Sequence, residues 1–248
     1  KEEEMKEEKE EKKLRVATHV SEEPLFDGMP EELLLSLSTL SPDQLNFVRL
    51  VLGQNESIWL TGIGGTGKSH VFRLAYQCYN FRNPGSALMT ALTGAAACRV
   101  NGTTFHSALK LGIGQGDEKR WRSVGYRLRR LKTHDKITCI FIDEISMANV
   151  TLLRAASTVL QSLFRNNKPF GGVQIVSCGD FLQLPPVSGK DSTPAESQMA
   201  FEEPLLWRYL CAKTVLLKDP WRHHADKEFF EFNASARAAR LTVERWRS

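Results

Sequence analysis

The sequence has few cysteines and no long apolar run. Five cysteines are spread over 248 residues and none forms a CxxC pair, which argues against a disulfide framework or a zinc site and for reduced thiols in an intracellular compartment. No apolar stretch approaches the ~20 residues that a membrane-spanning helix needs, so we expect no membrane partner. With 42% hydrophobic and 25% charged residues, the chain is neither collagen-like nor disordered as a whole.

A sequence that begins at Lys1 and not at Met is expected to be a piece of a longer chain, from which a targeting peptide could have been removed. Residues 1–15 carry six Lys/Arg and seven Glu, and such a segment forms either a disordered tail or a solvated helix. The next residues, 16–40, are broken by two prolines and a glycine. We expect a charged tail and linker over 1–40 and one folded unit over 41–248.

Short apolar runs alternate with helical patterns from residue 41 onward. Strands are expected at 57–61, 86–90, 137–142, 173–178 and 213–217. Helices are expected at 42–53, 67–80, 94–100, 119–132, 149–165, 202–210 and 226–239. This alternation predicts an α/β fold, a parallel sheet with helices on both faces.

The segment Gly62-Ile-Gly-Gly-Thr-Gly-Lys68-Ser69 has the pattern G-x-x-x-x-G-K-[ST]. It follows an apolar strand and precedes a helical stretch, which is where the glycines let backbone N–H groups wrap a phosphate chain. Lys68 is predicted to contact the β- and γ-phosphates, and the Ser69 hydroxyl to bind Mg²⁺. The loop predicts a nucleotide site made of Gly62, Gly64, Gly65, Thr66, Gly67, Lys68, Ser69 and His70.

Two acids, Asp143 and Glu144, end the apolar run 140–142. Ligands of open α/β sheets bind beyond the carboxyl ends of the strands, so Asp143 is predicted to hold Mg²⁺ and Glu144 to act as general base toward water. Gln183, just past another strand, could sense the γ-phosphate, or be an ordinary surface residue. Gln44 could read the edges of adenine through its amide; alone, that signal is weak.

Several blocks together resemble the petite integration frequency (Pif) helicases, 5′→3′ DNA helicases of superfamily 1B. The resemblance rests on LSPDQLNFV, GIGGTGKS, TALTGAAACRVNGTTFHSALKLGIG and the long stretch from Asp143 to Val187. A fainter match, WRHHADKEFFEFNASAR, departs from the usual FRQ pattern because His223 replaces the glutamine. The resemblance implies a RecA-like P-loop NTPase lobe that takes ATP and Mg²⁺.

The resemblance also implies roles for single residues: adenine contact for Gln44, catalysis for Lys68, Glu144, Gln183 and Arg222, and metal binding for Ser69 and Asp143. It implies contacts with single-stranded DNA from Thr93, Gly94, Thr104, Phe105, His106 and Ser107. From the residues alone, the DNA candidates could equally be turn and capping residues.

The family uses two RecA-like lobes, and the motifs of the second lobe are absent from this sequence, so we expect the first motor lobe only, with slow ATP hydrolysis or none by itself. The function implied is an ATP-dependent DNA helicase acting on single-stranded, duplex or G-rich structured DNA, in repair, recombination and telomere or genome maintenance, in the nucleus or mitochondrion. The alternative is a truncated adaptor that binds ATP or DNA without motor activity. A small-molecule kinase leaves the block from Asp143 to Val187 unexplained.

Residues 119–136 hold eight Lys/Arg against one acid, with Trp121 and Tyr126 among them. Basic and aromatic residues together are typical of a nucleic-acid surface, and also of a well-solvated helix. Both interpretations stay open from the sequence.

Overall fold

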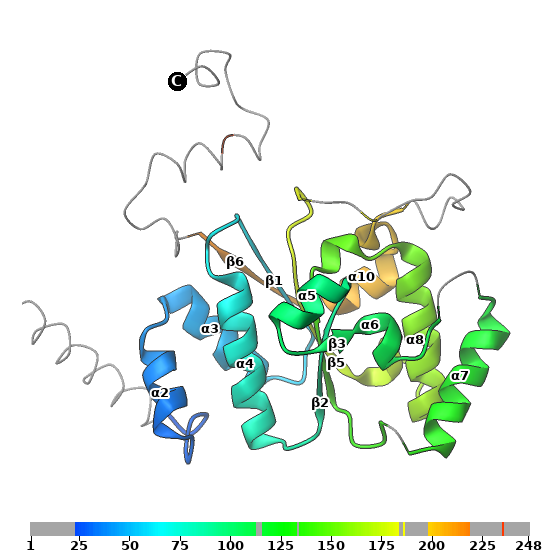
Figure 1. The fold of residues 1–248 in the computed structure, drawn as a ribbon, viewed down its shortest axis with the longest axis horizontal. Coiled ribbons are helices and arrows are strands. Elements are labelled where there is room, and N and C mark those ends of the chain that lie inside the picture. Colours follow the sequence, from blue (N-terminus) through cyan, green and yellow to red (C-terminus); the bar gives the residue numbers. More distant parts are fainter. Residues whose placement is uncertain are drawn as a thin grey trace, which may run out of the picture.

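A computed structural model describes residues 23–112, 116–132, 134–183 and 198–218, together with Pro186 and Ser235. They form a six-stranded parallel sheet in the order β3-β2-β4-β5-β1-β6. Figure 1 shows the strands at the centre of the molecule, with helices on either side. The predicted α/β fold with a covered parallel sheet is therefore confirmed.

The strands are β1 (Ile58–Gly62), β2 (Ala87–Ala91), β3 (Thr103–Thr104), β4 (Cys139–Asp143), β5 (Gln174–Cys178) and β6 (Lys213–Leu217). The α-helices are α2 (Glu31–Ser38), α3 (Pro42–Gly53), α4 (Lys68–Arg82), α5 (Gly94–Arg99), α6 (Phe105–Ala108), α7 (Glu118–Arg130), α8 (Val150–Phe164) and α10 (Pro204–Leu210). Short 3-10 turns lie at Ile145–Met147, Pro169–Gly172 and Ala200–Glu202. None of the described helices has the length and apolar character to cross a membrane.

Side chains of the central strands point alternately to two separate cores, as the two-residue repeat of a strand requires. In β4, Cys139 and Phe141 pack with α2, α3 and α4, whereas Ile140 and Ile142 pack with α7, α8 and α10. All five β4 residues are buried. Burial on both faces explains why the sequence of this strand is continuously apolar up to its final acid.

Residues 23–40 pack onto the folded unit, although the sequence assigns them to a linker. Phe26 is 1% exposed and Leu37 is fully buried. Leu37 is on α2, which contacts α4. The apolar run LLLSLSTL thus belongs to a helix with one face in the core.

Every predicted strand and most predicted helices are found, with shifts of a few residues at their ends. The two-residue strand β3, the four-residue helix α6 and helix α2 were not predicted. The helix expected at 226–239 falls outside the described residues, apart from Ser235.

Candidate nucleotide-binding site

The glycine-rich loop joins β1 to α4 at the carboxyl edge of the sheet. Gly67 precedes α4 with φ of 81°, a left-handed conformation that glycine adopts without the steric cost of a side chain. A Cβ at Gly62 would lie 2.5 Å from the Leu217 carbonyl oxygen of β6. Glycine at these two positions lets the chain turn sharply and pack closely against the neighbouring strand.

Lys68, the first residue of α4, reaches back across this loop. Its Nζ donates hydrogen bonds to the carbonyl oxygens of Gly62, at 2.8 Å, and Ile63, at 2.9 Å. The Thr66 hydroxyl also donates to the Ile63 carbonyl, at 2.8 Å. These bonds fix the curvature of the loop and keep the ammonium group at its centre.

The two predicted acids lie where β4 ends. Asp143 is 3% exposed, and burial raises the pKa of its carboxyl above the ordinary value, with the adjacent Glu144 raising it further. Glu144 has a left-handed backbone with φ of 59°, and this turn directs the chain away from the strand. Its Oε1 is 3.3 Å from Nη2 of Arg99.

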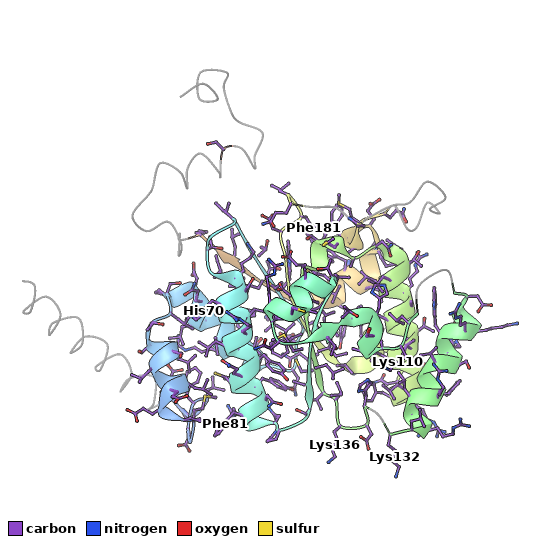
Figure 2. All side chains as sticks on the ribbon, in the orientation of Figure 1. His70, Phe81, Lys110, Lys132, Lys136 and Phe181 are labelled. Atoms are coloured by element: carbon purple, nitrogen blue, oxygen red, sulfur yellow. The ribbon has the colours of Figure 1, made fainter. Side chains whose placement is uncertain are left out.

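The loop, the acids and Gln183 surround one cavity of about 430 Å³. Its lining includes nine of the predicted site residues: Gly64, Gly65, Gly67, Lys68, Ser69, His70, Asp143, Glu144 and Gln183. Figure 2 labels His70 on α4, and burial lowers the pKa of its imidazole, with Arg73 lowering it further. Residues more than a hundred positions apart in sequence therefore form one site.

Gln44, on α3, contacts the glycine-rich loop and is 2% exposed. Its Oε1 accepts a hydrogen bond from the Ser41 backbone N–H at 3.0 Å, and its Nε2 donates to the Thr66 carbonyl at 3.1 Å. Gln44 thus caps α3 and ties it to the loop, and it is not among the residues that line the cavity.

The model of the PIF1-like helicase family matches residues 39–237, most of the chain. The chain belongs to the PIF1-like helicase family. It is 36% identical to the ATP-dependent DNA helicase PIF1 of Candida albicans over 197 residues, which cover 77% of this chain and 22% of that protein. It is also 36% identical to the Homo sapiens protein of the same name over 207 residues, 83% of this chain and 31% of that protein.

The fold of this PIF1-like chain matches solved helicase structures. The crystal structure of the Candida albicans Pif1 helicase superimposes with a TM-score of 0.75 at 34% identity, over 84% of this chain and 46% of that one. A Bacteroides Pif1 helicase in complex with ADP-AlF3 and ssDNA has the same fold, with a TM-score of 0.67 at 23% identity, over 83% of this chain and 48% of that one. The chain thus spans between about a fifth and a third of the curated relatives named above.

The PIF1-like site has oxygen donors that fit Mg²⁺. The Ser69 hydroxyl and the Asp143 carboxylate line the same cavity, and oxygen atoms are the ligands that Mg²⁺ prefers. Burial, and after it the neighbouring Glu144, raise the pKa of Asp143, and a cation beside the two acids would offset both effects by stabilising the carboxylate. These residues therefore fit the metal that the sequence predicts.

Four residues in the lining of this PIF1-like site were not predicted from the sequence: Arg73, Arg99, Cys178 and Gly179. Arg73 donates to the Ser69 carbonyl at 3.3 Å. Arg99 approaches Glu144 from a segment 45 positions away. A residue pattern within one segment contains no signal for such a contact.

The predicted DNA-contact residues have different environments. Thr93 caps α5 by accepting the Ala96 N–H, and Thr104 caps α6 by accepting the Ser107 N–H. Phe105 is 1% exposed, so its ring packs in the core of this structure, and its contact with DNA stays a prediction.

His106 and Thr93 line a second cavity of about 310 Å³. Burial lowers the pKa of the His106 imidazole. Gly94 begins α5, with open space where a Cβ would be. Arg222 lies outside the described residues, so its role stays a prediction.

Proposed function

We propose that this chain is the first, nucleotide-binding motor lobe of an ATP-dependent 5′→3′ DNA helicase. The observation that carries the proposal is the single cavity shared by Lys68, Ser69, Asp143, Glu144 and Gln183. Its two cationic neighbours, Arg73 and Arg99, make it suited to a polyanion such as a triphosphate. We assign the lobe to residues 41–248, with residues 23–40 packed against it.

Each group has a distinct task in the proposed hydrolysis. Loop N–H groups and Lys68 would hold the phosphates, and Lys68 would exchange its loop carbonyls for phosphate oxygens. Glu144 would accept a proton from the attacking water, and Gln183 would orient that water. Ser69 and Asp143 would hold Mg²⁺, which would offset the phosphate charge.

Gln183 is held by a neighbouring buried carboxylate. Its Nε2 donates to Asp180 Oδ2 at 3.1 Å, and Asp180 is 1% exposed. This bond fixes the amide at the edge of the cavity and leaves its carbonyl oxygen as an acceptor for water. Arg222 would add a positive charge at the γ-phosphate.

The proposed partner is DNA. Relatives are named ATP-dependent DNA helicases, and one solved helicase with the same fold is in complex with ssDNA. We extend these properties to the whole protein of which this chain is a part: translocation on single strands, unwinding of duplex or G-rich structures, and a role in repair, recombination and telomere or genome maintenance in the nucleus or mitochondrion.

ATP turnover with and without single-stranded DNA tests the proposal. We expect the parent chain, as a first lobe alone, to bind ATP and to hydrolyse it slowly at best, and we expect Lys68→Ala and Glu144→Gln to abolish any turnover that DNA stimulates. Loss of turnover with retained nucleotide binding in Glu144→Gln separates the chemical step from binding. A parent chain that binds ATP without turnover is a motor lobe that needs its second lobe, and a parent that binds no nucleotide refutes both the motor and the adaptor interpretations.

A further inference from the structure

The outer face of α7 is a stripe of exposed cations around one tyrosine. We define the outer stripe as Lys119, Arg122, Tyr126 and Arg130, spaced three, four and four residues apart, so that all four share one helix face. All four are exposed, and Tyr126 is 55% exposed. In Figure 1, α7 lies at one side of the molecule, beyond α8.

The opposite face of α7 explains why this stripe points outward. Gly125 and Leu128 are buried, and Trp121 and Val124 pack against the core formed with α8. A Cβ at Gly125 would lie 2.4 Å from the Val159 carbonyl oxygen of α8. This close contact fixes the rotation of α7 about its axis. The outer stripe lies on the opposite face of the helix and therefore faces solvent.

Most of the positive charge of the outer stripe is not neutralised by neighbouring carboxylates in the part of the chain that the structure describes. Among the described residues, Arg122 pairs with Glu118 at 2.6 Å, whereas Lys119 and Arg130 have no carboxylate within ion-pair distance. The helix as a whole holds six Lys/Arg against Glu118. Figure 2 shows Lys132 and Lys136 at the end of the molecule toward which α7 runs, so positive charge continues past the helix.

We propose that the outer stripe binds the phosphate backbone of duplex DNA. This inference rests on the proposed helicase function, and it adds a contact surface outside the nucleotide cavity. Lys119 and Arg130 are eleven residues apart, about 17 Å along the helix, which corresponds to roughly five phosphates of one strand along a duplex axis. Lysine, arginine and the tyrosine hydroxyl are all donors to phosphate oxygens.

The shape of the surface favours duplex over single-stranded DNA. A single strand is held in a groove with several stacking platforms, whereas the stripe lies on the convex outside of a helix and has one aromatic ring. The cations of the stripe lie at fixed positions along a rigid helix, and the phosphates of a duplex also lie at fixed positions along a rigid axis. The stripe therefore complements a duplex in charge and in rigidity.

The test compares two triple variants of the 248-residue chain that lose the same charge. The stripe variant is Lys119→Gln, Arg122→Gln and Arg130→Gln. The control variant is Lys168→Gln, Arg208→Gln and Lys213→Gln, three exposed residues outside α7. Fluorescence anisotropy measures binding to a blunt duplex and to a single strand over a range of salt concentrations, and circular dichroism checks that both variants stay folded.

We expect the stripe variant to lose at least about tenfold in duplex affinity near 0.1 M salt, and its log–log salt slope to fall by about 2 to 3. The control variant should bind duplex DNA within about threefold of the parent affinity. The stripe variant should keep its single-strand affinity and any ATP turnover within about threefold of the parent values. Equal losses in both variants, an unchanged slope, a parent that does not bind duplex, or an equal loss of single-strand affinity would each overturn the inference. A parent chain that binds no ATP counts against the proposed function instead.

Discussion

Gln44 connects helix α3 to the phosphate-binding loop, and its replacement by alanine gives a quantitative test of this connection. The substitution removes the acceptor of the Ser41 N–H and the donor to the Thr66 carbonyl. Thr66 is 1% exposed, so water cannot readily replace the lost bond to its carbonyl. Ser41 is half-exposed, so its N–H can be hydrated at small cost.

The expected loss follows from these two bonds. A buried group left without a partner costs about 1–3 kcal/mol, and the partly buried cap bond adds less, so we expect Gln44→Ala to lower the free energy of unfolding by about 2 kcal/mol. With an m-value of about 3 kcal/mol/M in urea, the midpoint falls by about 0.7 M.

Urea unfolding followed by circular dichroism measures this shift, with Gln77→Ala as the control because Gln77 is exposed in the middle of α4. Gln44→Glu separates the two bonds, since a carboxylate keeps the acceptor of the cap and loses the donor to Thr66. We expect Gln44→Glu to lose at least as much stability as Gln44→Ala. A loss in Gln44→Ala no larger than in Gln77→Ala, or a Gln44→Glu variant as stable as the parent, would refute the connection.

Three further predictions concern the packing and the charges of the lobe. Gly125→Ala should cost about 2 kcal/mol in thermal or urea unfolding, because the new methyl group meets the Val159 carbonyl. Asp143→Asn should abolish ATP turnover yet raise the free energy of unfolding by about 1 kcal/mol at pH 7. Burial raises the pKa of Asp143 in the folded lobe. The stability gained by the variant should therefore shrink as the pH falls through that pKa, because the aspartate of the parent then becomes neutral. Arg99→Ala should change the rate of ATP turnover by no more than about fivefold, since its pair with Glu144 is exposed, and Arg99→Lys should restore the parent rate.

The parts of the fold that the sequence predicts are those with a local pattern. The apolar run before Asp143 predicts both strand β4 and an acid at its carboxyl end, because a strand buried on both faces must be apolar until it leaves the core. The spacing of glycines and Lys68 predicts the loop for a similar reason. Helix α2 was missed because its short apolar stretch follows a highly charged tail and lacks a side-chain cap.

The environments of single site residues were harder to predict. Phe105 is the buried first residue of the four-residue helix α6, which Thr104 caps, and a helix this short cannot be predicted from periodicity. The spacing of Ser41 and Gln44 does carry a capping-box signal, which predicts the hydrogen bond to Ser41. The contact of Gln44 with Thr66 depends on how α3 packs beside the loop, and no local pattern contains it.

Equilibrium binding of a fluorescent ATP analogue with Mg²⁺ tests the central claim, that the cavity around Lys68 is a nucleotide site. The parent chain should bind saturably, and Lys68→Ala should weaken binding at least about tenfold, as expected for the loss of a charge-assisted bond to phosphate. Lys136→Ala, the change of an exposed lysine beyond α7, should bind like the parent. A parent that does not bind, or a Lys68→Ala variant that binds as tightly as the parent, would contradict the account.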